Sequence, residues 1–191
     1  MLPGLSGHLV SESFLEHELT SAAAGSLGPD VERVRIQLGA WRRSSAWLGP
    51  SAAVRTLFEA AGVRLVELLG FEPPSALELA GTMLASTILA AGDPIAWLVL
   101  PWGARLDPMW RSAVLQAQRR SARWTLLFNG THVRVVDAAR VYARRSAEFD
   151  VDLMLDHERT FLAFWLLLRA EALSNRSAES VSLRALADRS E

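Results

Sequence analysis

The amino-acid sequence predicts an α/β protein built on a mixed sheet. From residue 51 the apolar segments follow the order helix, three strands, helix, strand, which is typical of an α/β core. The run 95–102 (IAWLVLPW) is apolar on both faces, as in a strand covered by structure on both sides. Around Asn129-Gly130, two strand-like runs in 124–141 (WTLLFNGTHVRVVDAARV) are typical of a hairpin. A chain of 191 residues is long enough to bury a core of this kind.

The first part of the chain is predicted to be helical. Ser11, Asp30 and Ser51 are suitable N-caps, and the second and third segments end at Gly49-Pro50 and Gly62. The helices expected from these signals cover 11–24, 31–48 and 52–61. We assign 1–50 as an N-terminal helical segment that precedes the α/β core.

Strands are expected next. Segment 63–71 is β-branched and apolar and predicts the first strand. Segment 75–92 is compatible with either a helix or a strand, and we favour a strand over 82–91, because Gly92-Asp93-Pro94 then turns into the strand at 95–102.

The second half begins with a helix that Asp107-Pro108 initiates, 108–121. The hairpin strands 123–128 and 131–137 follow, and then a strand candidate at 148–155. A long helix over 157–173 is apolar around its whole circumference and should be buried. The expected core therefore spans 51–174, and 175–191 is a linker with a weak last helix or the start of a following module.

Composition excludes several classes of chemistry. All 20 basic residues are arginine, so neither a P-loop lysine nor a Schiff-base lysine exists in this chain. Cysteine is absent, which excludes disulfides and thiolate catalysis. The sequence contains no apolar run of membrane-spanning length and no signal-peptide pattern at its start. We expect a cytoplasmic protein.

The arginines are concentrated in the middle of the chain. Residues 101–145 hold nine arginines against two aspartates, a net charge of +7, while the segments on either side each carry −4. Guanidinium groups bind phosphates in a bidentate manner, so one electropositive face could contact the DNA backbone. The candidates are Arg105, Arg111, Arg119, Arg120, Arg134, Arg140, Arg144 and Arg145. An equally weighted alternative pairs several of them with acids such as Glu148, Asp150 and Asp152.

Several motifs of the second half occur together in one known family. They are LVLPWGARLDPMWRSAV, the Trp124 strand with its Asn129-Gly130 hairpin, Arg134 and Asp137, the pair Arg144-Arg145, and Glu148-Phe149-Asp150. FLAFWLLLRA and the opening HLVSESFLEHEL complete the pattern. In this combination the chain resembles the N-terminal, PD-(D/E)XK nuclease-like domain of type IIG-like restriction–modification proteins, in which an adenine-specific DNA methyltransferase follows. The resemblance implies a restriction-endonuclease-like fold with an αβββαβ core.

The chain departs from that family at the catalytic signature. Such nucleases carry an acid in the second core strand and an acid-x-Lys in the third, which together hold Mg²⁺ and the attacking water. The expected third strand, 95–102, contains neither an acid nor a lysine. Glu59 and Asp93 are only stray carboxylates, candidates for vestiges of the site. We therefore expect no hydrolytic site, no metal site and no cofactor.

The function expected from these features is that of a degenerate nuclease-like domain in restriction–modification or phage defence. It would contact double-stranded DNA, or dock a methyltransferase or specificity module in cis or in trans. One alternative is a purely structural or protein-interaction domain that binds no nucleic acid. A second is an active Mg²⁺-dependent endonuclease with a migrated site, which would need at least two carboxylates converging near 95–102.

Overall fold

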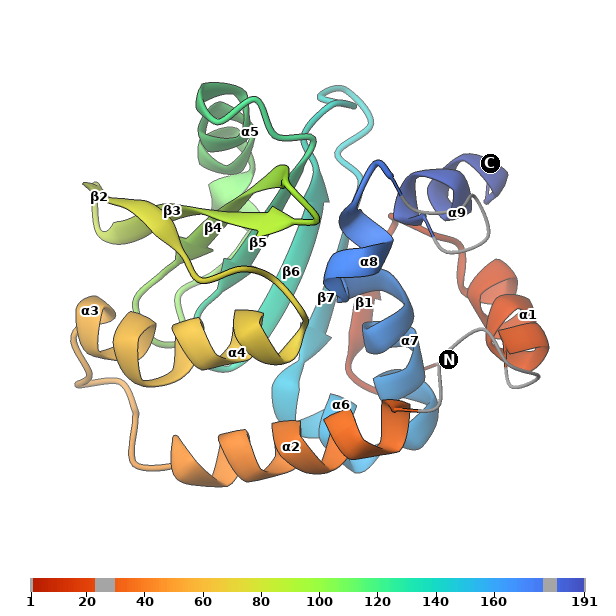
Figure 1. Ribbon diagram of the computed structural model, residues 1–191, viewed down its shortest axis with the longest axis horizontal. Helices are drawn as coiled ribbons and strands as arrows, with labels where there is room; N and C mark the ends of the chain where they lie inside the picture. Colours follow the sequence, from red (N-terminus) through yellow and green to blue (C-terminus); the bar gives the residue numbers. More distant parts are fainter. Residues whose placement is uncertain (1, 23–29, 177–181, 191) are drawn as a thin grey trace.

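The fold is organised around one mixed seven-stranded sheet, seen in a computed structural model that describes residues 2–22, 30–176 and 182–190 (Figure 1). Its strand order is β1-β7-β6-β5-β4-β3-β2. Neighbouring strands are antiparallel except for β4 and β5, which are parallel. The strands are β1 Leu5–Gly7, β2 Ser75–Ala80, β3 Met83–Ala90, β4 Asp93–Val99, β5 Trp124–Phe128, β6 His132–Asp137 and β7 Ser146–Asp150.

Helices cover the two faces of this sheet unequally. A helix is the usual connection between parallel strands, and here the crossover from β4 to β5 is made by η2 (Asp107–Met109) and α5 (Trp110–Arg119), on one face. The remaining helices contribute side chains to the large core on the other face (Figure 1). These are α1 Glu12–Ala22, α2 Val31–Ser44, α3 Val54–Leu57, η1 Phe58–Gly62, α4 Val63–Leu68, α6 Val151–Asp156, α7 Glu158–Leu168, α8 Ala170–Leu173 and α9 Leu183–Arg189.

Strand β4 is buried on both faces, as the apolar run in the sequence predicts. Ile95, Trp97 and Val99 belong to the large core on the many-helix side. Ala96 and Leu98 point the other way, into the two smaller apolar clusters beneath α5. The large core extends from Leu2 to Ala187 and so includes apolar side chains from both ends of the described chain.

The helix–three strands–helix–strand order expected from residue 51 is present, and the chain is an α/β protein with the mixed sheet of a restriction-endonuclease-like fold. The first strand of that order is not the one predicted. Residues 63–68 of that segment are helical: α3, a π-helical turn and α4 form one continuous helix over 54–68, and Gly62 does not end it. Strand β2, in the ambiguous segment after it, takes the place of the predicted strand.

Gly62 has a packing role instead of a terminating one. Its φ of −63° is helical, and a Cβ added there would lie 3.3 Å from Val99 Cγ2 of the central sheet. The absence of a side chain therefore lets the helix lie close to β4.

The structure also differs from the prediction at β7, in the long C-terminal helix and at β1. Strand β7 ends at Asp150, whose carboxylate accepts a hydrogen bond from Leu153 N (2.9 Å) and caps α6, so 151–156 is helix and not strand. The long helix over 157–173 breaks at Arg169, between α7 and α8. The short strand β1 was not predicted.

The hairpin at Asn129-Gly130 is confirmed, but its two residues have different roles. Gly130 has a φ of +86°, whereas Asn129 is not among the residues with positive φ. The buried Asn129 side chain instead binds the turn together: Oδ1 accepts from Thr131 N (3.0 Å) and His132 N (2.7 Å), and Nδ2 donates to Ala104 O (2.8 Å). The hairpin is thereby fixed to the loop that follows β4.

The edge strand β2 is irregular. Its pairing with β3 shifts register between Ser75 and Glu78, and Ala76 has a φ of +50°. Leu77 and Leu79 on this strand are exposed. The opposite edge of the sheet is the three-residue strand β1.

Candidate nucleic-acid interface

Four of the eight arginines selected from the sequence are held by the fold. Arg120 forms an ion pair with Glu78 (3.0 Å) and also donates to the Gln116 side chain. Arg140 forms an ion pair with Asp188 of α9 (2.5 Å), and Arg145 donates to Ala187 O (3.2 Å). The fourth, Arg134, lies on β6 and bridges two carboxylates. These side chains are engaged within the fold, and one of them, Arg134, binds an acid named in the alternative of internal pairing, Glu148.

The remaining four are exposed. Arg105 precedes the crossover helix, Arg111 and Arg119 lie on α5, and Arg144 lies in the loop 138–145 between β6 and β7. Among the described residues no hydrogen bond or ion pair engages the guanidinium group of Arg111, Arg119 or Arg144. These cationic groups are therefore available to an anionic partner.

Two of the exposed arginines border a groove between α5 and the loop 138–145, which we call the α5 groove. Its volume is about 400 Å³. None of the residues described as lining it is acidic; they are Trp110, Arg111, Val114, Leu115, Gln118, Val141, Tyr142 and Arg144. The basic middle of the sequence is thus reduced to a smaller positive surface along α5 and the neighbouring loop.

The groove also presents apolar side chains to solvent. Tyr142 is fully exposed, at 102% of its reference area, and Leu115 and Val141 are exposed as well. Tyr142 is the single tyrosine of the chain. Tyr142 is not among the candidates selected from the sequence, although it lies beside the Arg144-Arg145 pair.

The sequence-selected carboxylates are separately engaged. Glu59 is exposed on the π-helical turn and pairs with Arg55 (3.4 Å). Asp93 Oδ2 accepts from Ser174 Oγ (3.0 Å) and Asn175 N (2.8 Å). Burial opposes ionisation of Asp93, but these hydrogen bonds and the charge of Arg176 outweigh it and lower its pKa. Within 2–22, 30–176 and 182–190, no three His, Asp or Glu side chains gather as metal ligands.

One pair of carboxylates converges on Arg134 of β6, Asp107 from η2 and Glu148 from β7, and β7 is separated from β4 by β5 and β6. Arg134 Nη2 lies 2.7 Å from Asp107 Oδ1 and 2.5 Å from Glu148 Oε2, and Arg134 Nε donates to the same Glu148 oxygen at 2.6 Å. The hydrogen bond from Arg134, with its charge, lowers the pKa of Asp107. A guanidinium group thus occupies the position between the two acids, so a metal ion bound by both would have to displace it.

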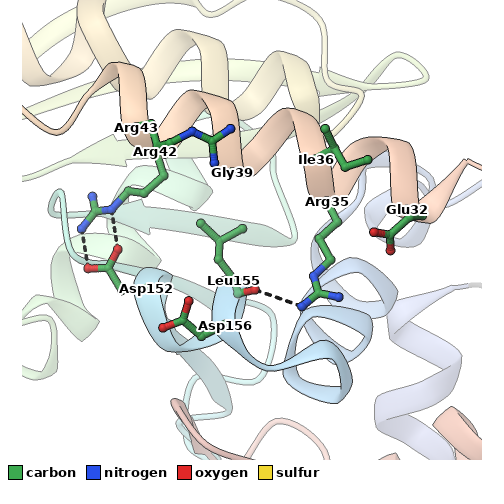
Figure 2. A pocket seen from close by; sticks show the side chains of 9 residues that line it. All are labelled: Glu32, Arg35, Ile36, Gly39, Arg42, Arg43, Asp152, Leu155 and Asp156. Carbon is green, nitrogen blue, oxygen red and sulfur yellow. Dashed lines mark hydrogen bonds and ion pairs between the residues drawn. The ribbon is translucent and has the colours of Figure 1, made fainter.

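A second hollow, of about 420 Å³, lies between α2 and α6 (Figure 2). Arg42 spans it, with Nε donating to Asp152 Oδ1 (2.6 Å), Nη2 to Oδ2 (2.7 Å) and Nη1 to Gly130 O (2.8 Å). The hydrogen bonds from Arg42 lower the pKa of Asp152. Arg35 of α2 makes a second bond across the hollow, from Nη2 to Leu155 O of α6 (3.2 Å). The bonds from Arg42 and Arg35 thus join α2 to α6 across this hollow.

Comparisons with protein-family models, curated proteins and solved structures returned no match to this chain. In the part of the chain that the structure describes, no helix has the length and apolar character needed to cross a bilayer.

Proposed function

We propose that this chain is a catalytically degenerate nuclease-like domain of a cytoplasmic restriction–modification or phage-defence protein, and that it contacts DNA phosphates along α5. The observation that carries the proposal is the set of four exposed arginines, Arg105, Arg111, Arg119 and Arg144, on and beside one helix. Arginine suits this role because its planar group binds phosphate oxygens in a bidentate manner.

The position of these arginines supports backbone contact more than reading of base sequence. Phosphate contacts hold a protein on the duplex and carry little sequence information. The α5 groove has no acidic lining residue that would repel phosphate. The missing acid-x-Lys in β4, and the use of Asp107 and Glu148 to bind Arg134, both favour binding without hydrolysis.

The test is fluorescence anisotropy of a labelled DNA duplex over a range of salt concentrations with Mg²⁺, with the same samples run on a gel for cleavage. The variant R111Q/R119Q/R144Q should weaken binding and flatten the dependence of log K on log salt. The slope should change by roughly 0.9 for each phosphate that the variant no longer neutralises. Cleavage of the duplex would instead support the active-nuclease alternative.

A matched control comes from the other side of the sheet. Arg33, Arg55 and Arg64 are exposed and lie on α2, α3 and α4. R33Q/R55Q/R64Q changes the net charge by the same amount and should leave the salt slope near that of the unsubstituted protein. Equal effects from both triple variants would mean that net charge, and not the α5 face, governs binding.

A second candidate is favoured by the exposed apolar side chains of the same groove. Leu115, Val141 and Tyr142 could pack against a methyltransferase or specificity module, in cis or in trans. A domain that serves only in structure or protein docking would bind no DNA at any salt concentration, and this result would refute the proposed DNA contact.

A further inference from the structure

The α5 groove presents side chains that phosphate contact alone does not require. Backbone binding needs cationic groups on an open surface, whereas this groove places an exposed aromatic ring and two aliphatic side chains among its arginines. A fully paired duplex keeps its bases stacked inside, so it offers no base face to that ring. An unpaired base does, and aromatic side chains next to basic ones are typical of surfaces that bind single strands.

The loop that carries the ring is held at both ends. Arg140 is bound to Asp188 (2.5 Å), Arg145 donates to Ala187 O (3.2 Å), and both partners belong to α9. Figure 1 shows the loop between α5 and α9. Ala143 N donates to Arg140 O (3.1 Å), which closes a turn at Tyr142. The turn is thus fixed on the body of the protein while Tyr142 extends fully into solvent.

The backbone beside the ring also departs from ordinary geometry. Arg144 has a φ of +46°, in the left-handed region that non-glycine residues seldom adopt. Its side chain is exposed and lines the groove opposite Arg111. Strained residues that persist at the border of a binding surface are a reason to examine that surface for function.

We infer that the α5 groove receives an unpaired nucleobase, which stacks on Tyr142 while Arg111 and Arg144 bind the flanking phosphates. The inference rests on the proposed function and makes it more specific: the preferred ligand is single-stranded DNA, or a duplex with an unpaired base. The volume of about 400 Å³ falls within the roughly 300–1,000 Å³ range of small-ligand pockets. Stacking tolerates every base, so little sequence preference is expected.

The test compares three labelled DNAs of equal length: a single strand, a paired duplex and a duplex with one bulged base. Y142A should weaken binding of the single strand and of the bulged duplex by roughly 5- to 150-fold, the usual effect of removing one stacking residue. Y142F keeps the ring and should bind within about twofold of the unsubstituted protein. Because Tyr142 is fully exposed, both variants should fold normally, which circular dichroism will verify.

A single strand with abasic sugars completes the design. It retains the phosphates and lacks the stacking partner, so Y142A should have no effect on its binding. An equal loss for every ligand, paired duplex included, would overturn the base-stacking inference and leave DNA binding intact. Salt-dependent duplex binding with no effect of Y142A on any ligand would do the same. Absence of binding to all four DNAs would overturn both the inference and the proposed function.

Discussion

Arg134 was selected from the sequence as a DNA contact, but in the structure it bridges Asp107 and Glu148. Its replacement therefore tests how much this internal pairing stabilises the fold. Its side chain is 12% exposed and that of Glu148 is 19% exposed, whereas Asp107 is largely in solvent. Replacing Arg134 with methionine leaves Glu148 without its cation on β7. Breaking a fully buried pair costs about 3–5 kcal/mol. Because this pair is partly hydrated, we expect R134M to lower the free energy of unfolding by roughly 2–3 kcal/mol.

That loss corresponds to a fall in Tm of about 4–12 °C for a chain of this size. The assay is urea unfolding followed by tryptophan fluorescence, for which the chain has seven tryptophans. The double variant R134M/E148M should recover most of the loss, because it leaves no unpaired carboxylate beneath the surface. The salt slope of DNA binding should not change in R134M, since the guanidinium is already engaged.

Two results would refute this reasoning. R134M within about 0.5 kcal/mol of the unsubstituted protein would show that the bridge contributes no more than an ordinary surface ion pair. A double variant no more stable than R134M would show that the loss arises from packing and not from an unpaired acid.

Two further predictions concern acid stability and a tight turn. Hydrogen bonds from arginines lower the pKa values of Asp107 and Asp152, so the stability that these carboxylates contribute is present above the unfolded value of about 3.9 and is lost as pH falls through the folded values. Urea titrations should show that the free energy of unfolding drops below about pH 4, and that the drop is smaller in D152N. An identical acid profile for D152N would contradict the assignment. A Cβ at Gly130 (φ +86°) would overlap the Trp102 ring, whereas one at Gly103 (φ +67°) meets nothing within 4 Å. Both G130A and G103A should incur the left-handed penalty of about 1–2 kcal/mol, but G130A should be clearly less stable by urea unfolding, and equal losses would exclude the clash.

The α/β class could be predicted from the sequence because the spacing of apolar residues along the chain reflects whether each segment is a helix or a strand. The strand predicted at 63–71 was wrong because the prediction relied on the β-branched residues of this segment and on Gly62 as the end of the preceding helix. Leu57, Ala61, Leu65 and Leu69 are all buried and recur every four residues through Gly62, which is the pattern of one helix face. Strand propensity is a weak guide when such a repeat crosses the proposed boundary.

The candidate site was predictable only in part. The concentration of arginines in 101–145 is visible in the sequence, but the fate of each side chain is not. Arg134 meets Glu148 across two paired strands, and Arg140 meets Asp188 of α9, 48 positions along the chain. Such pairings depend on strand register and helix docking, which the charge pattern does not encode.

The irregular edge of the sheet has a consequence for assembly. An open sheet exposes unpaired N–H and C=O groups along its outer strands, and a second copy could extend it by hydrogen bonding there. At β2 the apolar Leu77 and Leu79 would favour such contact, but the register shift after Ser75 interrupts the straight row of groups that an added strand would need. At the other edge β1 offers only three residues. The positive φ of Ala76 thus belongs to an edge whose irregular row of hydrogen-bonding groups is a poor template for an eighth strand.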